Sequence, residues 1–222
     1  MTIKLRFRQL SAVILAIPSS LMLVGLPANA FVQADLDKFR STRQCDGCDL
    51  SGADLSNQTL NSASLVGANL SNANLSGASL VDAKLSGANL TGANVSDAQL
   101  MGAMLAGAIL TGANLSNADL YNAWMDKAKL SGATLTGTDM GAARIIDADL
   151  SGVNAQGAFF NQAVLARSNL SNGSFSKAAM REVNLEGAIL TGANFDGADL
   201  FRARMPDSTL FTGSVTKFTQ TN

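Results

Sequence analysis

An apolar side chain occupies every fifth position from Leu50 to Val215, without insertion or deletion. Of these 34 positions, termed centres below, 23 are leucine and none is polar. Two residues before each centre lies a second, small position, which is alanine in 25 of the 34 units. Both positions are expected to point into a core, whereas the other three residues of each unit, mostly Ser, Thr, Asn, Asp and Gly, face water.

This period of five fits neither an α-helix, with 3.6 residues per turn, nor a flat strand, with a period of 2. It fits a chain that turns in every unit, and Gly, Asn or Asp stands at most positions two after the centre, where turn conformations are tolerated best. Four units close a square coil of twenty residues, and the stretch Leu90-Thr-Gly-Ala-Asn94 indeed returns at 110–114 and 190–194. The 34 units predict an all-β solenoid of about eight coils, stacked about 4.8 Å apart.

Side-chain volumes are compensated within single units, and charges agree with the twenty-residue spacing. Val153 is large where the centre shrinks to Ala155, and Gly173 is small where the centre grows to Phe175, as close packing demands. Charges of alternating sign, which adjacent strands favour, recur twenty residues apart in Lys127, Asp147 and Arg167.

Residues 1–30 have the organisation of an export signal. Lys4, Arg6 and Arg8 precede an apolar stretch, and Ala28-Asn29-Ala30 is a small-x-small cleavage site. We expect cleavage between Ala30 and Phe31, with no stable membrane insertion afterwards; an uncleaved membrane anchor is the alternative. Removing residues 1–30 takes away three of the 16 basic residues and none of the 17 acidic ones, which leaves a net charge of −4. This balance provides no electrostatic argument for binding nucleic acid.

Residues 31–44 precede the repeat and carry Val32, Leu36 and Phe39 at helical spacing. They predict a short amphipathic helix that caps the first open end of the stack, as terminal repeats require. The repeat itself spans 45–215, followed by a tail at 216–222. Phe211 and Phe218 are candidates to cover the second end.

Cys45 and Cys48 are the only cysteines. In an oxidising compartment they are expected to form a structural disulfide. A redox centre and half a zinc site are the alternatives, but no βαβ pattern surrounds the pair, and the chain has no His and no third Cys.

The repeated order alanine, then Asp or Asn, then leucine, as in Ala53-Asp54-Leu55 and Ala118-Asp119-Leu120, resembles the pentapeptide repeat proteins. The resemblance covers residues 48–215 and implies a right-handed quadrilateral β-helix. The segment 41–55, with its Cys45-Asp-Gly-Cys48 and the export signal before it, is similar to exported cyanobacterial members. This similarity implies a location in the periplasm or thylakoid lumen, but no particular function.

The sequence argues against an enzyme, because histidine, the commonest general base, is absent and no nucleotide-binding or hydrolase motif is present. Asp119 and Asp139 are expected to stack about 5 Å apart, within the range of paired-carboxylate chemistry. A convex wall without a pocket favours a solvated face instead. We therefore predict no catalytic, cofactor-binding or metal-binding residues. We also interpret the asparagines on one outward side as a stabilising amide ladder rather than a ligand surface: Asn74, Asn94, Asn114, Asn154 and Asn194.

The only Tyr and the only Trp lie close together, Tyr121 just after a centre and Trp124 just before the next. Met101 and Met104 hold the same two positions one coil earlier, and Arg144 extends the column. These five residues, named the interaction edge below, predict a partner or self-association surface. Scattered surface apolar residues, which are common, are the alternative.

Together these patterns predict a non-enzymatic, exported structural or protein-interaction module with an unidentified protein partner, no cofactor and no nucleic acid; a homodimer is left open. The alternative is a DNA-mimicking topoisomerase inhibitor, a role that the family resemblance implies for some members. It requires a cytoplasmic address and a strongly acidic wall, and the export signal and the small net charge disfavour both.

Overall fold

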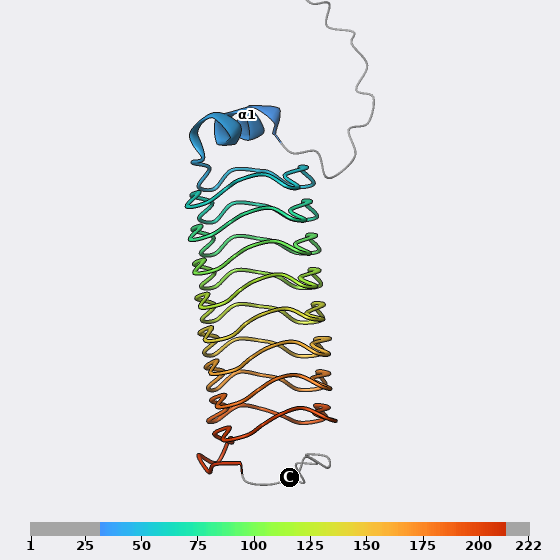
Figure 1. The fold of residues 1–222 in the computed structure, drawn as a ribbon. Coiled ribbons are helices and arrows are strands. Elements are labelled where there is room, and N and C mark those ends of the chain that lie inside the picture. The colour runs from blue at the N-terminus through green and yellow to red at the C-terminus, as the bar shows by residue number, and fades with distance from the viewer. Residues whose placement is uncertain (1–31, 212–222) are drawn as a thin grey trace, which may run out of the picture.

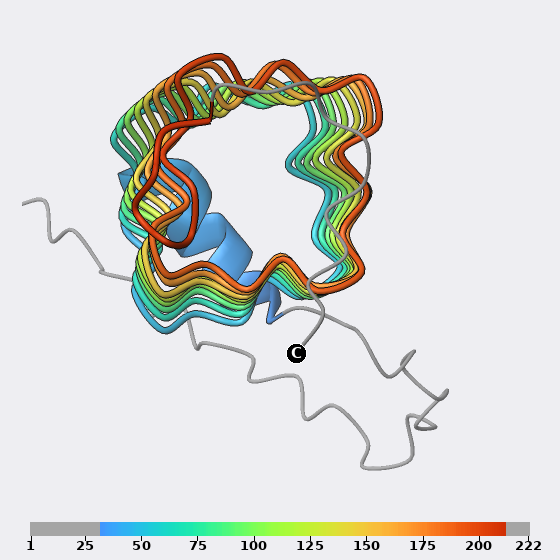
Figure 2. The ribbon, with the colours of Figure 1, turned by 90° about the horizontal axis from the view of Figure 1, so that it is seen from below.

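The computed structural model describes residues 32–211, which form a rod of stacked square coils with helix α1 (Gln33–Thr42) at one end (Figures 1 and 2). Parallel bridges join residues twenty apart, from Gln44 with Ser64 at the start to Asn184 with Arg204 at the end. In the described part the walls contain these isolated bridges and no longer strands. The reason is the five-residue unit, whose extended part is too short to pair consecutive residues before the chain turns.

The corners of the coil confirm the turn positions expected from the sequence. In every unit from Gly47 to Arg202, the residue two after the centre has a φ between +53° and +71°. Half of these residues are glycine, for which this left-handed conformation carries no steric penalty, and many of the others are Asn or Asp, which tolerate it well.

Backbone hydrogen bonds explain why the unit carries Asn or Asp before its leucine. In the unit 93–97, three N–H groups donate to carbonyl oxygens of the neighbouring coils, and the N–H of Ala93 donates to the carbonyl of Leu90 at 3.0 Å. The remaining N–H, that of Ser96, donates to Oδ1 of Asn94 at 3.3 Å. The polar side chain thus satisfies the one backbone donor that the coil itself leaves over.

The core fills the inside of the coils. Every centre from Leu50 to Met205 is buried, which confirms the inward assignment over this range. Near the C-terminal end the packing is aromatic, with the rings of Phe175 and Phe195 stacked at a centroid distance of 5.2 Å. A Cβ atom on Gly173 would lie 2.7 Å from Cε2 of Phe175, so the predicted exchange of volume between these two positions is confirmed.

The inward assignment is wrong at Leu210, whose side chain is 58% exposed. Arg204 pairs with Leu210 in an antiparallel bridge, so the chain folds back here, and within residues 32–211 no further coil covers the leucine. Phe211 packs against the end of the core, in line with the capping role suggested for it. Val215, Phe218 and the tail 216–222 lie outside the described residues.

Helix α1 covers the other end of the core (Figure 1). Leu36 and Phe39 are buried, whereas Val32, expected on the same face, is 47% exposed because it precedes the first helical turn as the N-cap. The carboxylate of Asp35 accepts the N–H of Asp49 at 2.8 Å and so attaches the helix to the first coil. Among residues 32–211 α1 is the one helix, and its ten residues are too few to cross a membrane.

Candidate functional site

The interaction edge forms as a continuous column on the outside of the rod. Met104 and Trp124 are bridge partners on adjacent coils, and so are Trp124 and Arg144. Met101, Met104, Tyr121 and Trp124 are all exposed, by 41 to 54%. The structure therefore brings together all five residues that the sequence placed along this edge.

Arg144 is held in place over the aromatic side chain. Its guanidinium carbon lies 5.9 Å from the ring centroid of Trp124, within cation–π range. Its Nε also donates to Oδ2 of Asp126 at 2.7 Å, and the second oxygen of that carboxylate accepts the N–H of Ile146 at 3.2 Å. Sequence reasoning missed the role of Asp126, because the ion pair joins positions 18 residues apart, one just after a centre and the other just before the next coil's centre.

A depression of about 320 Å³ extends over three successive coils, and its lining residues are Gly102, Met104, Asn122, Trp124 and Arg144. Beside it, the ring of Tyr121 extends over Gly141, where a Cβ atom would approach Cδ2 of the tyrosine to 3.0 Å. The absence of a side chain at Gly141 thus gives the tyrosine ring its place. The edge is an uneven apolar surface rather than a flat one.

Beneath α1, Cys45 and Cys48 form a disulfide with a Cα–Cα distance of 5.2 Å, as expected. Both cysteines are buried, and Nζ of Lys38 lies 3.9 Å from Sγ of Cys48. The carboxylate of Asp46 in the same loop accepts hydrogen bonds from the hydroxyl of Ser64 and the N–H of Val66, and these bonds lower its pKa from the usual value. The disulfide loop is therefore firmly attached to the second coil.

Asp119 and Asp139 are bridge partners on adjacent coils, as their spacing predicts. Each carboxylate is already engaged in a turn, Asp119 with the N–H of Tyr121 at 2.9 Å and Asp139 with the N–H of Gly141 at 2.8 Å. Their geometry matches a structural role of the kind described for Asn94. No group of three or more potential metal-ligating side chains occurs within residues 32–211.

The amide ladder forms only over part of its predicted length. Asn94 donates to Asn74, and Asn114 donates to Asn94, each at 3.3 Å. Thr134 and Ser174 interrupt the column, so Asn154 and Asn194 serve only their own turns. This limits the prediction to the first half of the rod.

At one corner of the coils, the predicted stacking of opposite charges includes a two-point ion pair. Arg167 donates to both carboxylate oxygens of Asp147, at 2.7 and 2.8 Å. These hydrogen bonds, together with the attraction of Arg167 and Lys127, hold the pKa of Asp147 below its usual range. The charge of Asp147 is therefore neutralised locally.

One cavity was not predicted at all. It lies between α1 and the first coil, and its lining residues include Arg40, Arg43 and Gln58. A signal for it is present in the sequence, since Gln58 stands at a position that alanine fills in most units.

Comparison with known proteins identifies the repeat. The family model described as pentapeptide repeats matches in eight copies between residues 44 and 210. No protein with a curated description matches the sequence.

Several solved structures are similar to this chain. HetL, a pentapeptide repeat protein involved in heterocyst differentiation regulation from the cyanobacterium Nostoc sp. strain PCC 7120, is 25% identical; the match covers 82% of this chain and 100% of HetL, with a TM-score of 0.29. AT2G44920, a pentapeptide repeat protein from the Arabidopsis thaliana thylakoid lumen, is 29% identical over 64% of this chain and 72% of its own, with a TM-score of 0.31. QnrB1, a plasmid-mediated fluoroquinolone resistance protein, is 16% identical over 68% and 91%, with a TM-score of 0.41. All three TM-scores lie below 0.5, so we base no functional argument on these structures.

The family model covers most of the chain, and its five-residue unit is the one that the structure winds into square coils. The chain therefore belongs to the pentapeptide repeat family, whose members fold as right-handed quadrilateral β-helices.

Proposed function

We propose that this protein is a non-enzymatic, exported rod that binds another protein through the interaction edge. The observation that carries the proposal is the column itself: four exposed large apolar side chains lie on two adjacent coils, and two of them, Met104 and Trp124, line one depression. Aromatic residues, methionine and arginine are the types enriched where proteins bind one another. Small clusters of this composition, rather than large areas, supply most of the binding energy.

The geometry of the edge suits a partner that inserts an apolar side chain. The depression is bordered by the side chains of Met104 and Trp124 and by the apolar stem of Arg144. Arg144 is already fixed by Asp126, so it loses little conformational freedom when a partner covers it. Its paired charge forms a polar rim next to the apolar centre.

Replacing Tyr121 and Trp124 together by serine should abolish most partner binding while leaving the fold intact. Both side chains point away from the core, so the cost in stability, which includes the lost cation–π contact of Trp124 with Arg144, is expected to stay within about 2 kcal/mol. Loss of two aromatic contact residues typically weakens a complex by about 2–4 kcal/mol, or roughly 30- to 1000-fold. Crosslinking followed by affinity purification from the protein's own compartment measures the recovery of the partner.

Ile189→Ser is the matched control, because this residue is 51% exposed but lies on a different wall. The control should recover the partner as the unaltered protein does. Equal recovery by the Tyr121/Trp124 variant and the control would reject the interaction edge as the binding surface.

Export is the second part of the proposal, and it rests on residues 1–30, which lie outside the described residues. The Cys45–Cys48 disulfide supports it, because such bonds persist in oxidising compartments. We expect fractionation to place the protein in the periplasm or thylakoid lumen, and N-terminal sequencing to begin at Phe31. A cytoplasmic protein that begins at Met1 would contradict export and return the DNA-mimicking alternative to consideration.

That alternative has little support from the charges of the described surface. A mimic of duplex DNA needs rows of free carboxylates, whereas several acidic side chains here pair with arginines. The pairs are Asp126 with Arg144, Asp147 with Arg167, Glu182 with Arg202, Glu186 with Arg204 and Asp199 with Arg181.

A further inference from the structure

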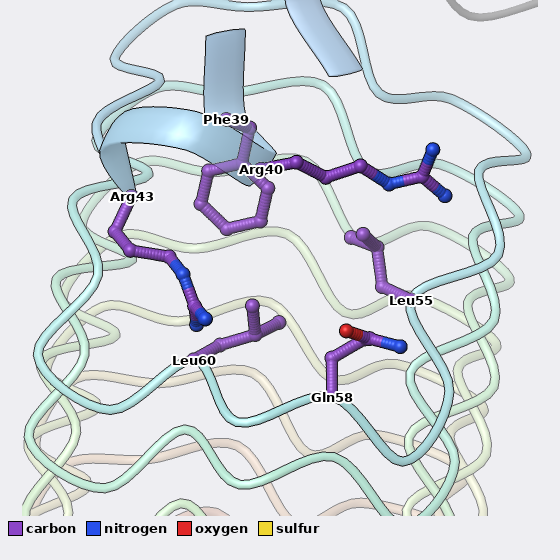
Figure 3. A pocket seen from close by; sticks show the side chains of 6 residues that line it. All are labelled: Phe39, Arg40, Arg43, Leu55, Gln58 and Leu60. Carbon is purple, nitrogen blue, oxygen red and sulfur yellow. The ribbon is translucent and has the colours of Figure 1, made fainter. Parts of the chain in front are cut away.

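The cavity between α1 and the first coil combines an apolar floor with a basic rim (Figure 3). Its volume is about 130 Å³. Phe39 from the helix and Leu55 and Leu60 from the coil form the floor, and each of these side chains is at most 3% exposed. Arg40 and Arg43, near the end of the helix, extend over opposite sides of the opening (Figure 3). Such a combination suits a ligand with an apolar body and a negative charge.

The two arginines have no acidic partner of their own. Within residues 32–211 neither guanidinium forms an ion pair or a hydrogen bond, whereas five other arginines are paired. Arg40 lies close enough to Asp54 to lower the pKa of that carboxyl, but hydrogen bonds from Ser56 and Asn74 contribute more to the shift. Asp54 is thus already engaged, at 3.1 Å from each donor. The positive charge of the rim remains available.

Gln58 marks the same place as a departure from the repeat. It occupies the inward position two before the centre Leu60, which is alanine in most units. Because no coil lies above the first one and α1 covers only part of its opening, the side chain is exposed and rises into the cavity between Leu55 and Leu60 (Figure 3). Its amide, which can both donate and accept hydrogen bonds, lines the same opening as the two arginines.

We propose that this cavity binds a small carboxylate with an apolar body, of about the size of one ring. The ring enters the cavity beside Phe39, Leu55 and Leu60; because these side chains are already buried, the apolar surface removed from water is that of the ring itself. The carboxylate stays at the opening, where the guanidinium groups of Arg40 and Arg43 offer charge-assisted hydrogen bonds and Gln58 donates a neutral one. The interaction edge takes no part, so this proposal stands or falls independently of protein binding by the rod.

Benzoate is the probe for this site, with benzamide as its uncharged equivalent. In nitrogen–proton NMR spectra of the purified full chain, benzoate should shift the side-chain signals of Gln58, Arg40 and Arg43, with a Kd in the millimolar range. Benzamide should bind at least tenfold more weakly. Equal responses to the two compounds, or shifts spread over the whole rod, would overturn the proposal.

Gln58→Glu tests the site, because it places a negative charge at the opening beside the two arginines. The two side chains have almost the same shape, so little else changes. Benzoate affinity should fall at least tenfold, while the thermal melt stays unchanged. Gln156→Glu adds the same charge at an exposed position on a distant coil and should leave binding unaltered. Arg40→Gln and Arg43→Gln should each weaken binding about fivefold or more. If Gln58→Glu binds benzoate as Gln156→Glu does, the carboxylate does not occupy this cavity.

Discussion

Leu110→Asp is expected to unfold the coils on both sides of residue 110. The leucine is 1% exposed and packs in the middle of the stack, so the variant loses about 2 kcal/mol of apolar burial. It also places a carboxylate where no partner charge is present, which costs several kcal/mol more. The sum is comparable to the whole stability of a typical domain, about 5–15 kcal/mol. Circular dichroism melts and limited proteolysis measure the loss.

Ile109→Asp is the control for this substitution. It introduces the same charge one residue earlier, on an outward-facing side chain whose bridge partner on the next coil is Lys129. Its melting temperature should stay close to that of the unaltered protein. If both aspartates lowered the melting temperature equally, or neither did, the inward assignment of the centres would be refuted.

The second large effect concerns the exchange of volume between Gly173 and Phe175. Phe175→Ala should cost about 3–5 kcal/mol, because it leaves a cavity beside Phe160 and Phe195. Gly173→Val should cost about 1–3 kcal/mol or more, because even a single carbon at this position lies 2.7 Å from the Phe175 ring.

The two substitutions together reproduce the arrangement one coil earlier, where Val153 and Ala155 fill the equivalent positions. The double variant should therefore be destabilised by less than the sum of the single variants, with a difference of about 1–3 kcal/mol. Chemical denaturation of all four proteins measures this coupling. Strict additivity would mean that the two residues do not share one space.

The five-residue period allowed the coil to be inferred from the sequence because every layer repeats the same physical problem. An apolar centre, in most units preceded by an alanine and followed by a turn residue, carries the same information in all 34 units. Single exceptions therefore could not obscure the pattern. For the same reason, the column from Met104 to Arg144 could be predicted from spacing alone.

The ends of the rod could not be inferred in this way. The repeat predicts that a centre is buried only where a neighbouring coil covers it, and at each end one neighbouring coil is missing. Leu210 fits the pattern, yet it is exposed because the chain folds back after Met205. At the other end, the cavity depends on how α1 lies across the first coil. Only Gln58 carried a local signal, and a single polar residue in a terminal coil is easily attributed to solvent exposure.

Ion pairs that run diagonally between adjacent coils were also missed. The ion pair of Asp126 with Arg144 joins residues 18 apart, whereas the charge pattern in the sequence was followed at a spacing of twenty residues. Arg181 with Asp199 and Arg204 with Glu186 follow the same diagonal. A charge comparison at a spacing of 18 would have identified all three.

The square cross-section also constrains how the gene can change in length. Deleting one five-residue unit keeps every later leucine facing inward, so the core tolerates it. Each later wall, however, moves by a quarter turn around the axis, and a deletion between Met104 and Trp124 would place the two residues on different walls. A binding surface formed by residues on adjacent coils is preserved only by insertions or deletions of twenty residues or a multiple of twenty. Length variation among relatives in multiples of five would preserve the rod, whereas multiples of twenty would preserve whatever binds along it.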